Sequence, residues 1–250
     1  MTVALLSAME EEMALYREVC GDIATVTRGP LRLHRTTYAG HALTLVKTGV
    51  GKVNAAMATQ GVIEAIAPDA VLCTGTAGAL HDAIEIGDVV VARDCVQHDL
   101  RVDFLGLPPG QVPFTDLRFF ETDPSLRARA QAVDLPGHST QVGRIVTGDL
   151  FVQDEAARRT LRDELAGDCV EMEGAAVGQV CTVHEIPFLL LRGISDRADG
   201  RSGVDFQTSL EDAAQASARG ALAVLRDLET GGGKGDGARQ LGTGATDRPQ

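Results

Sequence analysis

Short apolar runs alternate with segments of helical periodicity along most of this chain, and this alternation restricts the fold more than any other feature. The runs lie at residues 2–8, 70–73, 89–92, 142–146 and 187–191, and charged residues, Thr or Gly bound them. Continuous apolar runs of this length are typical of strands that are buried on both faces of a largely parallel sheet. Strands that alternate with helices predict the α/β class.

Three segments carry the spacing of amphipathic helices. Residues 10–19 follow the first strand, and residues 51–67 place Val53, Ala56, Ile63 and Ile66 on one stripe. The last helix is predicted to begin at a capping box, Thr208–Glu211, and to keep its apolar stripe up to Leu228. Residues 33–48 read as two strands around a turn, and residues 105–120, with three Pro, read as a long ordered loop.

The length of 250 residues fits a single α/β domain. We expect this domain to span residues 1–230 and to contain a twisted, mixed, mostly parallel central sheet that is flanked by helices. Residues 231–250 hold seven of the 28 glycines and almost no apolar side chains. That composition predicts a disordered Gly-rich C-terminal tail with no role in the fold.

The charge balance excludes several classes of partner. Lys and Arg number 23 against 35 Asp and Glu, a net charge of −12, whereas nucleic acids and anionic membranes attract basic surfaces. No apolar run approaches the ~18 residues of a membrane span, and the N-terminus shows no basic leader. The five Cys show neither C-x-x-C nor zinc-ligand spacing, which predicts buried free thiols in a reducing cytoplasm. We expect no nucleic acid, membrane, metal or cofactor.

One motif invites a phosphate-binding interpretation and fails it. Gly49-Val50-Gly51-Lys52 would be the end of a phosphate loop, but Val46 stands where that loop needs its first Gly, and Val53 where it needs Ser or Thr. A dinucleotide fingerprint fails as well, because Asn54 replaces the third Gly. What remains is a tight turn into a helix N-terminus, which could still face a polar ligand.

Acids, hydroxyls and glycines gather where the apolar runs end. They occur in residues 8–12, 74–78, 171–174 and 192–196, and ligands of open α/β sheets bind beyond the carboxyl ends of strands. Each segment also has a purely structural interpretation: a charged helix start, a Gly turn or a helix cap. Glu171 and Glu173 resist that interpretation, because carboxylates in an apolar stretch need a partner or a function.

Taken together, these segments resemble one protein family. The pieces A-M-E-E-E, T-G-V-G-K-V-N-A-A, T-G-T-A-G, G-D-V-V-V, Q-H-D, T-G-D-L-F-V, V-E-M-E-G-A-A and R-G-I-S-D-R-A-D follow one another along residues 1–228. This order is similar to that of the bacterial 5′-methylthioadenosine/S-adenosylhomocysteine nucleosidases of the purine nucleoside phosphorylase superfamily. The resemblance implies a nucleoside phosphorylase-like fold, a small nucleoside substrate, a homodimer and release of adenine by hydrolysis.

The resemblance also implies catalytic roles that agree with the chemistry of the bond. Adenine leaves poorly unless it is protonated, so a carboxylic acid with a raised pKa is required. Asp196 matches the acid that acts at the purine nitrogen N7, with Ser195 supporting it. A second carboxylate must activate water on the opposite face of the sugar. Glu12 matches it, and Thr76 and Arg192 match residues that hold the water.

Further matches predict how the substrate is bound. Glu173 would bind the ribose hydroxyls and Met172 would pack on the sugar. The backbone of Phe151 and Val152 would recognise the edge of adenine, while the Phe151 ring stacks on the base. Three other substrate-binding candidates lie in the same motifs: Ala77, Gly78 and Glu171.

The pocket for the 5′-substituent is where this chain departs from the family pattern. The resemblance implies an apolar lid from a neighbouring subunit, made here by Val102, Leu105 and Pro113. Arg101 stands where an acid is frequent, and Leu107 where an aromatic residue is common.

Three alternatives to the nucleosidase prediction follow. Aminodeoxyfutalosine hydrolase is one, because only the 5′ pocket of the enzyme would distinguish its substrate from methylthioadenosine and S-adenosylhomocysteine. A purine nucleoside phosphorylase is disfavoured, because the three Glu of residues 10–12 would repel phosphate. A non-catalytic nucleoside-binding module is disfavoured, because both proposed catalytic acids are present.

Overall fold

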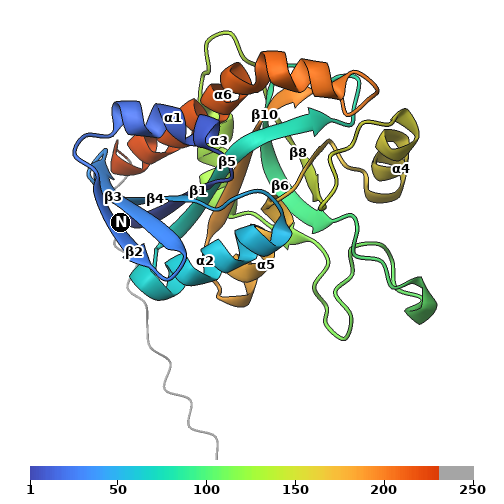
Figure 1. Ribbon diagram of the computed structural model, residues 1–250, viewed down its shortest axis with the longest axis horizontal. Helices are drawn as coiled ribbons and strands as arrows, with labels where there is room; N and C mark the ends of the chain where they lie inside the picture. Colours follow the sequence, from blue (N-terminus) through green and yellow to red (C-terminus); the bar gives the residue numbers. More distant parts are fainter. Residues whose placement is uncertain (231–250) are drawn as a thin grey trace, which may run out of the picture.

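A ten-stranded mixed sheet forms the centre of this computed structural model, which describes residues 1–230 (Figure 1). The strands are β1 (Thr2–Ser7), β2 (Ala24–Arg28), β3 (Leu31–Tyr38), β4 (His41–Lys47), β5 (Ala70–Ala79), β6 (Val89–Gln97), β7 (Phe120–Glu121), β8 (Thr140–Thr147), β9 (Cys169–Glu171) and β10 (Phe188–Asp196). The helices are α1 (Glu10–Val19), α2 (Lys52–Ile66), α3 (Pro124–Ala132), α4 (Glu155–Leu165), α5 (Gly174–Val183) and α6 (Ser202–Thr230), with a 3₁₀ turn η1 (Asp103–Leu105). The tail predicted at residues 231–250 lies outside the described part of the chain.

The sheet closes on itself at one end. Its strand order is β10-β6-β8-β9-β5-β1-β4-β3-β2, and β10 also pairs with β5, so five strands form a closed ring. The pairs β1–β4, β1–β5, β5–β10, β6–β8 and β8–β9 are parallel. Antiparallel pairs bring in the hairpin strands β2 and β3 and join β10 to β6 and β5 to β9. The α/β class with a mixed central sheet is confirmed.

Helices cover both faces of this sheet. Helices α1, α3 and α6 lie on one face, and α2 and α5 lie side by side on the other (Figure 1). The side chains of β1 alternate between the two layers: Val3 and Leu5 join the core under α1 and α6, whereas Ala4 and Leu6 join the core over α2 and α5. Burial on both faces explains why the first strand reads as one continuous apolar run.

Helix α2 buries a stripe that overlaps the predicted one, because Ile63 is buried and Ala56 and Ile66 pack partly against the core. Ala55, Ala58 and Val62 face the core, whereas Val53 is 78% exposed. The small side chains on the buried stripe allow α2 to lie close to α5 and the sheet. The predicted stripe was therefore wrong at its first position, because spacing alone does not show which apolar side a helix turns inward.

Helix α6 begins earlier than its predicted capping box. It starts at Ser202, and Thr208 lies within it, where the Thr208 hydroxyl donates to the carbonyls of Val204 and Asp205. The predicted start was wrong by about two turns, and the extra turns cover the carboxyl end of β10. No helix within residues 1–230 is long and apolar enough to cross a membrane.

The five cysteines agree with their predicted role. All are buried and none forms a disulfide. Burial raises the pKa of the Cys73 thiol to about 11, so this group stays neutral near neutral pH.

Candidate active site

A cavity of about 390 Å³ opens at the carboxyl ends of the parallel strands β1, β5 and β10. It has a size typical of small-molecule sites. The cavity brings together residues that lie far apart in the sequence, because the ends of parallel strands meet at one edge. Its lining consists of Ala8, Met9, Glu12, Val50, Thr76, Ala77, Gly78, Phe151, Val170, Glu171, Met172, Glu173, Ser195, Asp196, Gly203, Phe206 and Gln207.

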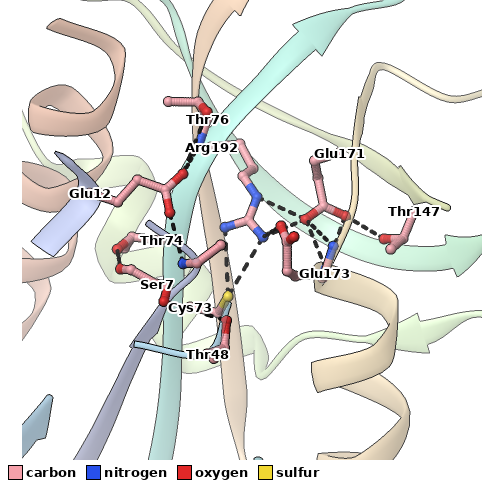
Figure 2. A network of polar contacts seen from close by, with 12 residues as sticks. Ser7, Glu12, Thr48, Cys73, Thr74, Thr76, Thr147, Glu171, Glu173 and Arg192 are labelled. Atoms are coloured by element: carbon pink, nitrogen blue, oxygen red, sulfur yellow. Dashed lines mark hydrogen bonds and ion pairs between the residues drawn. The ribbon is translucent and has the colours of Figure 1, made fainter. Parts of the chain in front are cut away.

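Glu12 is buried at the start of α1 and fixed by hydrogen bonds at both carboxylate oxygens. Oε2 accepts the backbone N–H groups of Ala8 (2.8 Å) and Met9 (3.1 Å), and Oε1 accepts the N–H of Thr76 (3.1 Å), as Figure 2 shows in part. Burial raises the pKa of Glu12 above its usual range, although the Arg192 guanidinium and the backbone N–H groups oppose the rise. Glu12 is therefore a rigidly held carboxylate with the raised basicity that a general base requires.

Two glycines of T-G-T-A-G let the carboxylates approach strand β5. The motif lies inside β5 rather than in a turn after it. A Cβ on Gly75 would lie 2.8 Å from Glu12 Oε1, and a Cβ on Gly78 would lie 2.7 Å from Asp196 Oδ1. Any side chain at either position would displace a carboxylate, so these glycines leave room for the two acids.

Arg192 and Glu171 form an ion pair that is almost completely buried behind the cavity (Figure 2). Arg192 donates to Glu171 through Nε (3.0 Å) and Nη2, and both terminal nitrogens lie 3.6 Å from the Cys73 sulfur. Burial opposes the charge, but the Glu171 carboxylate holds the pKa of Arg192 well above its usual range. Arg192 therefore remains a fixed cation between Glu12 on one side and Glu171 and Glu173 on the other.

The Glu171 carboxylate accepts several hydrogen bonds from groups of the protein itself. It accepts the Thr147 hydroxyl and the backbone N–H groups of Glu173 (3.0 Å) and Gly174 (2.8 Å), in addition to Arg192. Although Glu171 borders the cavity, these contacts assign it to holding Arg192 and the start of α5 in place.

Glu173 is the more weakly held acid of the pair. Its Oε1 accepts the N–H of Gly51 (2.8 Å), and its Oε2 lies 3.9 Å from Arg192 Nη2. Burial raises the pKa of Glu173 to about 8, and the Glu171 carboxylate adds to this rise. A positive charge that develops in the cavity would favour the ionised form of this carboxylate and be stabilised by it.

Asp196 ends strand β10 at the far side of the cavity. Its Oδ2 accepts the Ser195 hydroxyl (2.9 Å) and its Oδ1 accepts the N–H of Ala198 (2.9 Å). Burial raises the pKa of Asp196, against the effect of these hydrogen bonds. Because α6 begins only at Ser202, Asp196 does not cap that helix, and a raised pKa suits a general acid.

Of the three acids at the start of α1, only Glu12 faces the cavity. Glu10 and Glu11 are exposed, and Glu10 forms ion pairs with Lys47 (2.7 Å) and Arg17 (2.6 Å). Three negative charges were expected to repel phosphate from the site. In the structure only one of them, the buried Glu12 carboxylate, lines the cavity.

Comparisons with known proteins agree with this geometry. The family model described as the phosphorylase superfamily matches residues 2–226. A 5′-methylthioadenosine/S-adenosylhomocysteine nucleosidase from Bacillus cereus is 38% identical over 232 residues, which cover 92% of this chain and 100% of the relative. The chain belongs to this nucleosidase family within the phosphorylase superfamily.

Solved structures extend the comparison. The Neisseria meningitidis nucleosidase in complex with methylthio-immucillin-A superposes with a TM-score of 0.87 at 36% identity, covering 91% of this chain and 99% of that one. A futalosine hydrolase from Helicobacter pylori superposes with a TM-score of 0.85 at 32% identity, covering 91% and 98%. The scaffold of this family therefore carries more than one nucleoside specificity.

The structure gathers most of the predicted site residues around one cavity. Val152 lines a small adjoining cavity with Phe151 and Asp196, and Arg192 lies behind the lining, where it contacts Glu171. Among residues 1–230, no group of three His, Cys, Asp or Glu side chains is arranged to hold a metal ion.

Seven lining residues were not among the predicted site residues: Ala8, Met9, Val50, Val170, Gly203, Phe206 and Gln207. The last three lie on the part of α6 that precedes its predicted start. The Phe206 ring packs edge-on against Phe151, with centroids 5.6 Å apart. A sequence prediction that started α6 at Ser202 would have included Phe206 in the helix and placed this aromatic pair at the site.

The predicted lid residues lie away from the cavity of their own chain. Val102, Leu105 and Pro113 are absent from its lining, and the green segment between β6 and β7 extends outward from the body of the molecule (Figure 1). Arg101, which stands where an acid is frequent in the family, forms an ion pair with Glu164 of α4.

Proposed function

We propose that this enzyme hydrolyses the N-glycosidic bond of 5′-methylthioadenosine, S-adenosylhomocysteine or both, and releases adenine and the 5-thioribose. The observation that carries the proposal is the lining of one cavity by Glu12, Glu173 and Asp196, three buried carboxylates with raised pKa values. The family membership supports the same reaction.

Asp196 acts as the acid in this mechanism. Its raised pKa favours the protonated carboxyl group, which donates its proton to N7 of adenine as the bond breaks. Ser195, held between Asp196 Oδ2 (2.9 Å) and the carbonyl of Ala77 (3.4 Å), orients the carboxyl group. The half-exposed Phe151 ring stacks on the departing base.

Glu12 acts as the base on the other face of the sugar. Its ionised carboxylate takes a proton from water while the Thr76 hydroxyl, 3.5 Å from Oε1, helps to hold that water. Glu173 binds the ribose hydroxyls, and its negative charge stabilises the cationic sugar as the bond breaks. Arg192, which pairs with Glu171 and lies 3.9 Å from Glu173 Oε2, supplies a fixed positive charge that favours the ionised forms of Glu12 and Glu173.

We predict that adenine release needs no phosphate. The phosphate site of a phosphorylase requires cationic groups, whereas here the buried Glu12 carboxylate lies just beyond the end of β1, where it accepts the N–H of Ala8. Free base would be assayed from methylthioadenosine, S-adenosylhomocysteine, aminodeoxyfutalosine and inosine, each with and without phosphate. Equal rates in both buffers support hydrolysis, and strict dependence on phosphate would make the enzyme a phosphorylase.

The same assay decides between the nucleosidase and a hydrolase of the futalosine type, which the Helicobacter pylori neighbour makes a specific alternative. An apolar 5′ pocket bounded by Met9, Val50 and Phe206 favours methylthioadenosine. Preference for aminodeoxyfutalosine would transfer the mechanism to that substrate unchanged. The buried free thiols suit a reducing compartment, and we place the enzyme in the cytoplasm.

We further propose a homodimer in which each loop between β6 and β7 completes the partner's site. A groove of about 480 Å³ between α2 and α5 is bordered by the exposed Val53 and Val183, which are 78% and 63% accessible. On the loop, Phe104 and Phe114 are 86% and 95% accessible. Apolar surface of this extent favours association with another protein surface.

Val53→Asp is expected to disrupt this dimer and to lower kcat/KM, because the 5′ pocket loses its lid. Light scattering should give twice the chain mass of 26.3 kDa for the unmodified protein and a single mass for the variant. Val19→Asp, on the opposite face of the sheet, is the matched control and should change neither quantity. A fully active monomeric Val53→Asp variant would contradict the shared site.

A further inference from the structure

The turn at residues 49–52 matches no phosphate motif, but its backbone N–H groups donate hydrogen bonds to two carboxylates of the protein itself. The N–H of Gly51 donates to Glu173 Oε1 (2.8 Å), and the N–H of Lys52 donates to Asp149 Oδ1 (2.8 Å). Both groups lie at the N-terminus of α2, where backbone N–H groups and the helix dipole favour negative charge. The helix start thus binds one acid of the cavity and one acid outside it.

The acid outside the cavity belongs to a closed ring of polar contacts. Lys52 Nζ donates to Asp99 Oδ1 (2.6 Å) and to Gln97 Oε1 (3.0 Å), and the N–H of Asp149 donates to Asp99 Oδ2 (3.0 Å). The side chains of Lys52 and Asp99 are only 19% and 32% exposed. The ring therefore ties the start of α2 to the end of β6 and to the segment after β8.

Gly51 depends on this ring for its position. Its φ of 97° lies in the region that favours glycine, and a Cβ would stand 3.0 Å from Asp149 Oδ1. Within residues 1–230, the N–H of Gly51 is the only hydrogen-bond donor to the Glu173 carboxylate. The direction of Glu173 toward the cavity therefore rests on a backbone group that residues outside the cavity hold in place.

We propose that Lys52, Asp99 and Asp149 are positioning residues that fix Glu173 for ribose recognition through the N–H of Gly51. The inference rests on the proposed role of Glu173. The ring restrains the turn and the turn aims one N–H at Oε1, whereas Oε2, 3.9 Å from Arg192 Nη2, accepts no hydrogen bond within residues 1–230 and can receive the ribose hydroxyls. The same hydrogen bond favours the ionised carboxylate, which burial and the neighbouring Glu171 disfavour.

The decisive variant is Lys52→Met, which removes the ammonium group and keeps the length of the side chain. Its kcat/KM should fall about ten- to a hundredfold, because small misplacements of a binding group have effects of this size. The acid limb of its pH profile should move to higher pH, because Glu173 loses a donor that favours ionisation. Lys47→Met is the matched control: Lys47 pairs with the exposed Glu10, so activity should be unchanged.

Two comparisons separate positioning from general loss of structure. Asp149→Asn keeps an oxygen that accepts the N–H of Lys52 and should restore most of the activity that Asp149→Ala loses. In a Glu173→Gln background, Lys52→Met should cause almost no further loss, since the residue that it positions is already changed. Additive losses together with an unmoved acid limb would overturn the proposal.

A binding measurement tests the same proposal without turnover. Calorimetry with formycin A, a carbon-linked adenosine analogue that cannot be hydrolysed, and with free adenine separates ribose recognition from base recognition. Lys52→Met should weaken formycin A binding about tenfold and leave adenine binding unchanged, whereas equal effects on both would refute the positioning of Glu173. Failure of the unmodified enzyme to release adenine would contradict the proposed function instead.

Discussion

Asp196→Asn is expected to lower the rate of adenine release by about two orders of magnitude or more, the range for loss of a general acid. Asparagine has nearly the same shape as aspartate, and its amide oxygen can still accept the N–H of Ala198 as Asp196 Oδ1 does. The amide has no acidic proton to give to the base. The substitution therefore removes the chemistry of Asp196 and keeps most of its packing.

The measurement is kcat/KM for methylthioadenosine across a pH series. Burial raises the pKa of Asp196, so the unmodified enzyme should lose activity as pH rises through that pKa and the acid ionises. The variant should lack this alkaline limb. A riboside whose leaving group needs no proton, such as a nitrophenyl riboside, is the matched substrate and should be cleaved at a nearly normal rate. A variant that hydrolyses methylthioadenosine almost normally would remove Asp196 from the mechanism.

Glu12→Gln should have an effect of similar size, about two orders of magnitude or more, for the opposite reason. The glutamine oxygen can keep the N–H groups of Ala8 and Met9, but the amide cannot take a proton from water. Activity requires the ionised form of Glu12, and burial raises its pKa. The unmodified enzyme should therefore lose activity as pH falls through the raised pKa values of Glu12 and Glu173, and the variant should keep only the part of this acid limb that Glu173 causes.

Glu10→Gln is the control for charge in this prediction. It changes the net charge by the same amount, two positions earlier in the chain, but Glu10 is exposed and paired with Lys47 and Arg17. Its kcat/KM and melting temperature should stay close to those of the unmodified enzyme. An equal loss of activity in Glu10→Gln and Glu12→Gln would show that the charge of the segment matters and that Glu12 is no base.

The strands and the gathering of acids at their ends were predictable, because both depend on local pattern. The runs from Thr2 and from Phe188 became buried strands, and Glu12 and Asp196 came to one cavity because β1, β5 and β10 are parallel. The exposure of Val53 on α2 and the start of α6 at Ser202 were not predicted. A helical stripe shows that a side is apolar, but the neighbouring elements decide whether that side meets the core or solvent.

The sequence alone determined the α/β alternation, the buried thiols and the set of acids from which the site is built, because these follow from hydrophobic pattern and residue type. Tertiary structure decided what each acid does. Glu171 is bound by Arg192, and Glu173 is bound by Gly51, which lies 122 positions away in the chain. Two carboxylates separated by one residue thus differ in partners and in availability to a ligand, because burial and pairing arise from segments that meet only in the folded protein.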